Sequence, residues 1–169
     1  MDPLPTPEAS PPVMFGAPAP PGDLLPWTWA EQRLTTAKNY WIATTRPGGR
    51  PHCRPVWGVW LSGGFWFSTG SLAARNLPLN DEITVHLEDG QEVVIVEGTA
   101  RKARLETDHD ALRDMCGTYS SKYDYPVTPV GGEVRDSNGV GGPALRVAPR
   151  AVFGWDRDMT SPTKWTFNR

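Results

Sequence analysis

The sequence is poor in the residues that build metal centres and disulfide frameworks. Its 169 residues include two cysteines, Cys53 and Cys116, and three histidines, none of them at the spacing of metal ligands. It also lacks the G-x-S-x-G turn of many hydrolases and a phosphate-binding loop that ends in Gly-Lys-Ser or Gly-Lys-Thr. These absences argue against a metalloenzyme, a serine hydrolase of that class and a P-loop nucleotidase. We expect both cysteines to be reduced, buried thiols of a cytoplasmic protein.

Charge of one sign and long apolar runs are also missing. The 17 basic residues are interspersed with 19 acidic ones, and the formal net charge is −2. A nucleic-acid partner normally requires a basic face, so this balance argues against one. No apolar run is long enough to cross a bilayer, and the first residues lack the basic and apolar regions of a secretory signal. We therefore expect no membrane span and a cytoplasmic location.

Proline, in contrast, is abundant and unevenly placed. Nine of the 18 prolines fall within residues 1–26, among small residues that pack poorly. This composition predicts a disordered, partly polyproline-like tail over residues 1–26. The remaining residues, 27–169, are enough for one domain with one hydrophobic core.

Strand-like segments separated by turn residues follow the tail. β-branched and aromatic residues mark the predicted strands, and Gly, Pro, Asn and Asp mark the turns. The main strands are expected over residues 40–45, 50–60, 65–69, 83–87, 93–100 and 144–155, with a closing segment at 163–167. Strands and helices do not alternate, because the helices are few and short. The fold class is therefore mainly β, an antiparallel barrel of about six strands.

Three short helices and one long loop complete the prediction. The helices are expected over residues 28–38, 71–79 and 108–119. Thr28 and Glu31 form a capping-box pattern at the first, and Thr107 is expected to cap the third. Residues 125–142 show no periodicity and predict a long loop that would serve as a lid over a site.

The second and third predicted strands carry polar and aromatic side chains side by side. Alternation places His52, Arg54 and Val56 on one face of the second strand, and Pro55 and Trp57 on the other. Proline cannot donate a backbone hydrogen bond, so it marks a break where neighbouring backbone groups can face a ligand. This combination suits the edge of a flat ring system. Ordinary aromatic packing is the simpler alternative for any one tryptophan.

The third strand runs into a helix start that is rich in polar groups. These residues are Ser68, Thr69, Gly70, Ser71, Arg75 and Asn76. Hydroxyls and the free amides of a helix start favour an anion, and Arg75 lies four residues after Ser71 on a similar helix face. The cluster predicts a phosphate site. In the alternative, Ser71 only caps the helix and Arg75 is only a surface cation.

Short motifs along the chain resemble those of a known family. The matching segments are residues 40–44, 49–52, 55–58, 67–69, 74–77, 85–88, 94–98, 122–123 and 163–167. In order and spacing they resemble the flavin/deazaflavin oxidoreductase group with the pyridoxamine 5'-phosphate oxidase-like, FMN-binding split β-barrel, close to its actinobacterial B subgroup. The resemblance implies a split β-barrel with Greek-key-like connections, and a homodimer with two cofactor sites at the subunit interface.

The same resemblance implies a cofactor and the residues that bind it. The cofactor would be the deazaflavin coenzyme F-420, or FMN as in sister groups. The residues implied to border the ring are His52, Pro55, Val56 and Trp57. Those implied to hold the phosphate end are Ser68, Thr69, Gly70, Ser71, Arg75 and Asn76. Lys164 and Trp165 are implied to approach from the partner chain.

Three functions follow as hypotheses. The leading one is an oxidoreductase that transfers a hydride from reduced F-420 to a small conjugated or quinone-like acceptor, with His52 and Arg54 as candidate proton donors. The second is an FMN-dependent enzyme like pyridoxamine phosphate oxidase. The third is a non-catalytic protein that binds or carries a flavin or deazaflavin.

The chain departs from its relatives at the phosphate end. Leu72 and Ala73 stand where relatives often carry a basic pair, and Lys164 stands where an arginine is common. Losing the basic pair weakens the electrostatic hold on a polyanionic tail, which slightly favours the carrier hypothesis.

Overall fold

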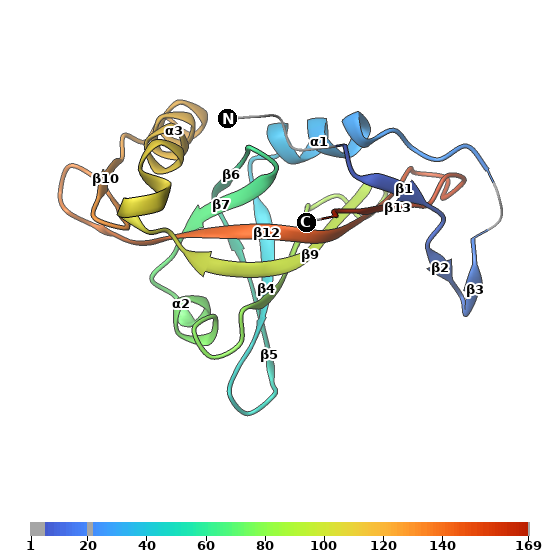
Figure 1. Ribbon diagram of the computed structural model, residues 1–169, viewed down its shortest axis with the longest axis horizontal. Coiled ribbons are helices and arrows are strands. Elements are labelled where there is room, and N and C mark those ends of the chain that lie inside the picture. Colours follow the sequence, from blue (N-terminus) through green and yellow to red (C-terminus); the bar gives the residue numbers. More distant parts are fainter. Residues whose placement is uncertain (1–5, 20–21, 169) are drawn as a thin grey trace.

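The computed structural model describes residues 6–19 and 22–168 and shows a long, twisted antiparallel sheet with helices on both of its sides (Figure 1). The strands of the main sheet are β1 (Glu8–Ser10), β4 (Tyr40–Thr45), β5 (Pro51–Val56), β6 (Gly58–Leu61), β7 (Gly64–Ser68), β8 (Glu82–His86), β9 (Val93–Lys102), β10 (Thr128–Val130), β11 (Glu133–Arg135), β12 (Gly141–Trp155) and β13 (Thr163–Thr166). Two further strands, β2 (Val13–Met14) and β3 (Ala17–Pro18), form a separate hairpin. The mainly β class is confirmed.

The strands form one wall in the order β5-β4-β8-β9-β12, and β12 also pairs with β7, which pairs with β6. The long strand β12 pairs with β9 along its length, with a register shift between Pro149 and Ala151. Proline has no backbone N–H for the ladder, so a bulge is expected there. The antiparallel barrel is confirmed. It has more than six strands because the predicted strand over residues 50–60 divides into β5 and β6, and short strands are added.

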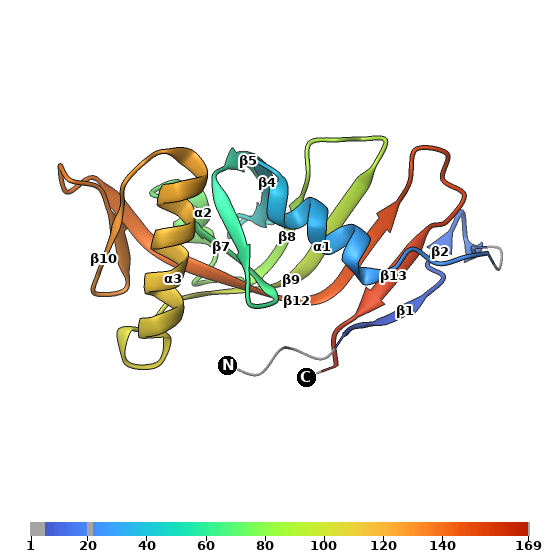
Figure 2. The same ribbon diagram turned by 90° about the horizontal axis from the view of Figure 1, so that it is seen from above.

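Three helices in the described part of the chain cover the wall. They are α1 (Trp27–Thr36), α2 (Leu72–Asn76) and α3 (Leu105–Tyr123). Figures 1 and 2 show α1 and α3 on one side of β12, and Figure 1 shows α2 on the other. Among the described residues, no helix is long and apolar enough to cross a membrane.

The barrel closes where β5 passes into β6 through the single residue Trp57. At this seam the Gly58 amide donates to the Tyr123 hydroxyl at 2.9 Å. The Gly58 carbonyl accepts from Lys122 Nζ at 3.2 Å. The Tyr123 hydroxyl also lies 2.8 Å from the Gly58 carbonyl and 2.7 Å from the Lys38 carbonyl, and it donates to one of them at a time. The end of α3 therefore satisfies the backbone at the seam.

Two apolar cores lie on the two sides of β7. Phe65 and Phe67 point into the barrel, while Trp66 points to the opposite side and packs in a second core that includes Leu112 and other residues of α3. All three aromatic residues are almost fully buried, which explains the continuous apolar character of this strand. Of the two cysteines, Cys116 is buried in the second core as predicted, whereas Cys53 is exposed on β5.

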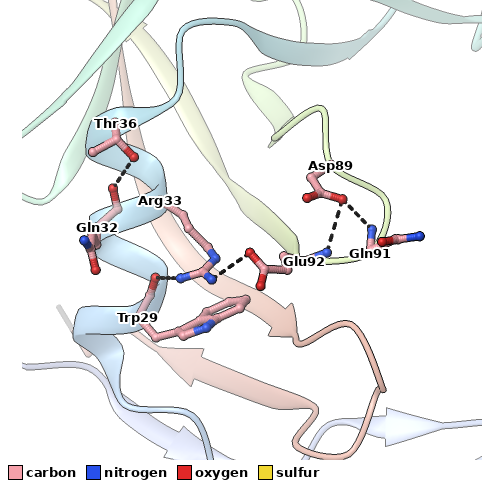
Figure 3. Close-up of polar contacts among 7 residues, drawn as sticks. All are labelled: Trp29, Gln32, Arg33, Thr36, Asp89, Gln91 and Glu92. Atoms are coloured by element: carbon pink, nitrogen blue, oxygen red, sulfur yellow. Dashed lines mark hydrogen bonds and ion pairs between the residues drawn. The ribbon is translucent and has the colours of Figure 1, made fainter.

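Helix α1 is fixed to the turn between β8 and β9 by Arg33 (Figure 3). The Arg33 guanidinium lies 3.9 Å from the Trp29 ring centroid and pairs with Glu92 at 2.7 Å. Asp89 shapes the turn by accepting the backbone amides of Gln91 at 2.8 Å and Glu92 at 3.3 Å. A local turn and a long-range ion pair thus hold the helix against the wall.

The first helix starts differently from the prediction. It begins at Trp27 after Pro26 and has no side-chain cap, so the capping box at Thr28 and Glu31 is wrong. Pro26 has φ −67° and an extended ψ of 148°, which ends the preceding extended segment directly before the helix.

The third helix is longer than predicted at both ends. It begins at Leu105, so Thr107 is not its cap. Asp108 instead pairs with Arg101 at 2.6 Å and accepts the Arg104 amide at 2.8 Å, and these contacts hold its pKa at about 2. Its end at Tyr123 carries the helix to the seam.

Part of the predicted disordered tail is a strand. Residues Glu8–Ser10 pair with β13, and Ala9 lies opposite Trp165. The prediction of disorder is wrong for these residues. The edge of β13 offers unpaired backbone groups, and Glu8–Ser10 pairs with them as a strand. Residues 1–5 and 20–21 of the same predicted tail lie outside the described residues. The boundary between tail and domain after residue 26 stays a prediction.

The structureless loop predicted over residues 125–142 contains a hairpin. Strands β10 and β11 pair with Pro129 opposite Val134, and β11 continues the ladder onto β12. Within the described chain β10 pairs only with β11, so Pro129 sits on an edge strand, where proline is tolerated. Short strands with little alternation carry no periodic signal, which explains the error.

Replacing Gly58 tests the seam. A Cβ there would lie 2.4 Å from the Phe65 ring and 2.7 Å from the Trp66 carbonyl oxygen. We expect Gly58→Ala to lower the free energy of unfolding by about 1–3 kcal/mol, measured by urea denaturation. Gly117→Ala is the matched control, because Gly117 lies in α3 with open space around it, and alanine should raise stability there by up to about 1 kcal/mol. Equal stability of Gly58→Ala and the unchanged protein would contradict this account.

Candidate functional site

Cationic side chains gather on one face of the β4–β5 hairpin. Residues directly opposite each other in an antiparallel pair share a face, and Thr44 lies opposite His52. Arg54 follows two residues later on the same face. Arg46 and Arg50 continue it at the hairpin end, where the Arg46 amide donates to the Arg50 carbonyl at 2.9 Å. We call Arg46, Arg50, His52 and Arg54 the cationic face.

Helix α2 packs against this face at Thr44. The Asn76 side-chain amide donates to Thr44 Oγ1 at 3.0 Å, and both residues are buried. This bond holds the end of α2, with the exposed Arg75, beside the hairpin (Figure 1). The structure therefore brings the predicted residues His52 and Asn76 together through Thr44, which the sequence did not single out.

Two polar atoms of the cationic face are buried without a partner. His52 Nδ1 and Arg46 Nε make no hydrogen bond within the described part of the chain. Buried polar groups in native proteins are nearly always bonded, and leaving one unbonded costs free energy. Binding of an anionic group from outside the chain to this face would give the two unpaired atoms hydrogen-bond partners.

The arginines at this place have no carboxylate partner among the described residues. No ion pair formed by the described residues includes Arg46, Arg50, Arg54 or Arg75. The sequence holds a signal for this, because residues 32–80 contain six basic residues and no Asp or Glu. The formal net charge of −2 concealed this local excess of basic residues, which a count of charged residues by segment would have found. An uncompensated positive region attracts anionic ligands.

The predicted phosphate turn forms a hydroxyl network. Ser71 caps α2 through Oγ, which accepts the Ala73 amide at 3.2 Å, as predicted for a cap. Thr69 Oγ1 donates to Ser71 Oγ at 2.9 Å, and Ser68 Oγ donates to the Gly142 carbonyl at 3.1 Å. These hydroxyls already have partners within the chain, and α2 has only five residues, so its dipole is weak. A phosphate contact here stays a prediction.

The same turn is open on one side. Apart from Gly70 and its two chain neighbours, no described residue has an atom within 4 Å of where a Cβ would stand at Gly70, and Leu72 is 41% exposed. A ligand can therefore approach the turn from this side.

Three of the four residues predicted to border the ring, Pro55, Val56 and Trp57, lie at the opposite end of β5 from the hairpin, whereas the fourth, His52, lies on the cationic face. Pro55 is exposed opposite Trp41, and Val56 is buried opposite Tyr40. Trp57 is 44% exposed. Pro55 and Trp57 therefore offer side chains to a ligand here, whereas Val56 is buried within the β4–β5 ladder.

Lys122 lies behind this end of β5 in a half-buried position. Its Nζ donates to the Tyr40 hydroxyl at 2.7 Å, the Gly58 carbonyl at 3.2 Å and the Thr35 carbonyl at 3.3 Å. Burial lowers the pKa of Lys122 to about 8, because the ammonium loses hydration. Burial also raises the pKa of Tyr40, whose hydroxyl donates to the Leu34 carbonyl at 2.6 Å. The sequence did not indicate Lys122 as a site residue, because Tyr40 is 82 residues away.

The two residues predicted to reach a partner chain lie on β13. Trp165 is fully buried in the barrel core, with Ala9 and Val152 opposite it on the neighbouring strands. Its indole has no open face for a ligand in this structure. Lys164 is partly exposed, and its Nζ lies 5.8 Å from the Phe153 ring centroid. Within one chain, β13 lies at the opposite end of the sheet from α2 (Figure 1).

A separate cavity of about 540 Å³ lies between the two ends of the chain and the strands β9 and β12. Its lining includes Glu8, Arg101, Arg146 and Phe167. No residue of the predicted site is among the described residues that line it.

Comparison with known proteins decides the family. The family model for pyridoxamine 5'-phosphate oxidase matches residues 30–155, which is more than half of the chain. The chain belongs to the pyridoxamine 5'-phosphate oxidase family. The resemblance that the motifs indicated is confirmed, and the barrel is the split barrel of this family. Among curated proteins, none matches the sequence.

Several solved structures share the fold. A conserved hypothetical protein from Mycobacterium tuberculosis is 21% identical with a TM-score of 0.63, over 79% of this chain and 86% of that chain. A protein named F420 reductase is 20% identical with a TM-score of 0.52, over 72% and 94%. A pyridoxamine 5'-phosphate oxidase-related, FMN binding protein from Nostoc punctiforme is 15% identical with a TM-score of 0.54, over 83% and 85%. At these identities the likeness establishes the fold.

Lys122 should make stability depend on pH. Its pKa is about 8 in the folded protein and 10.5 for a free side chain, so the unfolded state binds more protons between these values. Burial of the ammonium therefore lowers the free energy of unfolding by its full amount below pH 8, and this loss disappears as the pH rises toward 10.5. From pH 7.5 to 9.5, the unchanged protein should gain about 1 kcal/mol of unfolding free energy relative to Lys122→Met, less than the full value because the group is half-buried.

Urea denaturation at the two pH values measures this gain. Lys102→Met, which removes an exposed lysine of β9, is the control and should show no comparable gain. A constant difference between the unchanged protein and Lys122→Met would show that the ammonium is not desolvated.

Proposed function

We propose that the chain is an oxidoreductase that uses the reduced deazaflavin coenzyme F-420 to transfer a hydride to a small conjugated or quinone-like acceptor. The cationic face, with its two orphaned buried atoms, carries this proposal. A neighbour of the same fold is named F420 reductase, which supports that coenzyme. When bound, the deazaflavin supplies the hydride chemistry, and the protein supplies position and electrostatics.

The cationic face would hold the anionic end of the cofactor. Arg50, Arg54 and Arg75 are exposed, and a guanidinium binds phosphate or carboxylate through two parallel hydrogen bonds. These arginines would replace the charge that is missing at Leu72 and Ala73. The other groups proposed for this end are those of Ser68, Thr69, Gly70, Ser71 and Asn76.

The opposite end of β5 would border the ring. Pro55 has no backbone N–H to donate, and Val56 and Trp57 follow it directly. A hydride transfer to the acceptor also takes up one proton. The candidate donors are solvent, His52 and Arg54, and Arg54, which directly precedes Pro55, is the nearer of the two residues to this end of β5.

A second copy of the chain would complete the site. Of the described strands only β4 pairs with β5, and side chains on both faces of β5 are exposed, Cys53 and Pro55 on one face and Arg54 on the other. Open edge strands are usually covered in native proteins. We propose a cytoplasmic homodimer that covers this edge and excludes water, with Lys164 rather than the buried Trp165 reaching the second site.

Two other functions have observations in their favour. An FMN-dependent enzyme like pyridoxamine phosphate oxidase is supported by the family match and by the FMN binding neighbour. A non-catalytic flavin or deazaflavin carrier is supported by the exposed Leu72, which stands where relatives often carry a basic residue.

Fluorescence titration with F-420 and with FMN tests the proposal. We expect Arg54→Ala and Arg75→Ala each to weaken F-420 binding about tenfold, because each removes a charge-assisted contact to the anionic end. Arg113→Ala is the matched control, since Arg113 is an exposed arginine of α3 that pairs with Asp110. Unchanged F-420 affinity in Arg54→Ala, Arg75→Ala and the double variant would show that the anionic end of the cofactor binds elsewhere.

The same titration separates the three functions. Binding of F-420 followed by its reoxidation with quinones supports the reductase. Binding of FMN alone would refute the proposed cofactor. Binding of F-420 without turnover of any quinone would favour the carrier.

A further inference from the structure

Three tyrosines surround Trp57 at the end of β5. Trp57 stacks on Tyr123, with ring centroids 4.6 Å apart and planes 6° apart. The rings of Tyr119 and Tyr125 each lie 6.2 Å from Trp57, one tilted and one edge-on. Trp57 is 44% exposed and Tyr125 is 40% exposed, so this cluster keeps aromatic surface open to solvent. We call Trp57, Tyr119, Tyr123 and Tyr125 the aromatic platform.

Hydrogen bonds hold the platform in place. The Tyr123 hydroxyl accepts the amide of Gly58, the residue after Trp57. The Tyr125 hydroxyl donates to Asp136 Oδ2 at 2.6 Å. Aromatic rings fixed in this way lose little conformational entropy when a flat molecule stacks on them.

Asp136 places a negative charge at the rim of the platform. The Tyr125 hydroxyl and the backbone amides of Val140 and Asn138 bond the carboxylate and hold its pKa below its usual range. The group is therefore an anion at neutral pH, and it disfavours a second anion beside it. Lys122, the cation behind the platform, already donates to three protein oxygens.

We propose that the aromatic platform is the stacking site for the acceptor, and that the acceptor is a flat, conjugated, uncharged molecule. The identification of this ligand as the acceptor rests on the proposed function, whereas its binding to the platform does not. The platform shares Trp57 with the proposed ring end of the cofactor site, so a molecule stacked on the platform would lie beside the cofactor ring. The cationic face lies at the other end of β5 and remains available for the anionic end of the cofactor.

Stacking and charge together define the ligand. Contact with ring faces favours any flat conjugated molecule. A phosphorylated pyridine ring would also stack, but its phosphate would meet Asp136 where it requires a cation. The platform therefore selects against the substrate class of a pyridoxamine phosphate oxidase.

Menadione, an uncharged naphthoquinone, tests the platform in the protein without cofactor. The indole N–H signal of Trp57 in nitrogen-15 NMR spectra is identified by its absence from Trp57→Phe. We expect this signal to shift and saturate on titration. Trp57→Leu should weaken menadione binding roughly tenfold, and Trp57→Phe should weaken it less because a ring remains.

Trp41→Leu is the matched control. Trp41 is a partly exposed tryptophan of β4 that stacks on His86 with planes 2° apart. Its replacement should leave menadione affinity unchanged, and the spectra show whether each variant is folded. Equal weakening by Trp41→Leu and Trp57→Leu, or binding that shifts no Trp57 signal, would overturn the proposal.

Pyridoxal 5'-phosphate serves as a flat but anionic probe. We expect it to bind more weakly than menadione, and Asp136→Asn to strengthen its binding while menadione affinity stays the same. Tighter binding of pyridoxal 5'-phosphate than of menadione at Trp57 would contradict the proposal that the acceptor is uncharged.

The menadione experiment and the cofactor titration test different proposals, and their failures can be told apart. Menadione binding at Trp57 in a protein that binds neither F-420 nor FMN would refute the proposed function and retain the platform. Cofactor binding without any menadione contact at Trp57 would refute the platform alone.

Discussion

The barrel depends on how its wall closes between β5 and β6. There the backbone of Gly58 is bonded by the side chains of Tyr123 and Lys122. A buried backbone group without a partner would cost about 1–3 kcal/mol, so the end of α3 is needed at this place. The same contacts set the Tyr123 ring against Trp57 and the Lys122 ammonium against Tyr40. A structural requirement of the barrel therefore builds part of the candidate site.

Strand β5 separates two chemical environments. At its hairpin end, arginines and His52 share one face without a carboxylate among the described residues to neutralise them. At its other end, aromatic rings surround Trp57, and Asp136 adds a negative charge. Six residues of a strand span about 20 Å, at roughly 3.3 Å per residue. A ligand with an anionic tail and a flat ring matches this separation.

Local signals in the sequence predicted local structure well. Ser71 caps α2 because a serine side chain reaches the amide two residues on, which depends on nothing distant. The main strands were also predictable, since β-branched and aromatic runs are bounded by turn residues. The short hairpin after residue 125 and the strand at Glu8–Ser10 were not. Each is stabilised by a neighbouring strand rather than by its own composition.

The mainly β class, the family and the hydroxyl-rich turn before α2 follow from the order of residues along the chain. Which side chains meet follows from the way the elements pack. The register of β4 and β5 placed His52 beside Thr44 and Asn76, and the packing of α3 brought Tyr123 to Gly58, 65 residues away. Such contacts depend on how strands pair and where helices pack. The spacing of residues along the chain does not encode either.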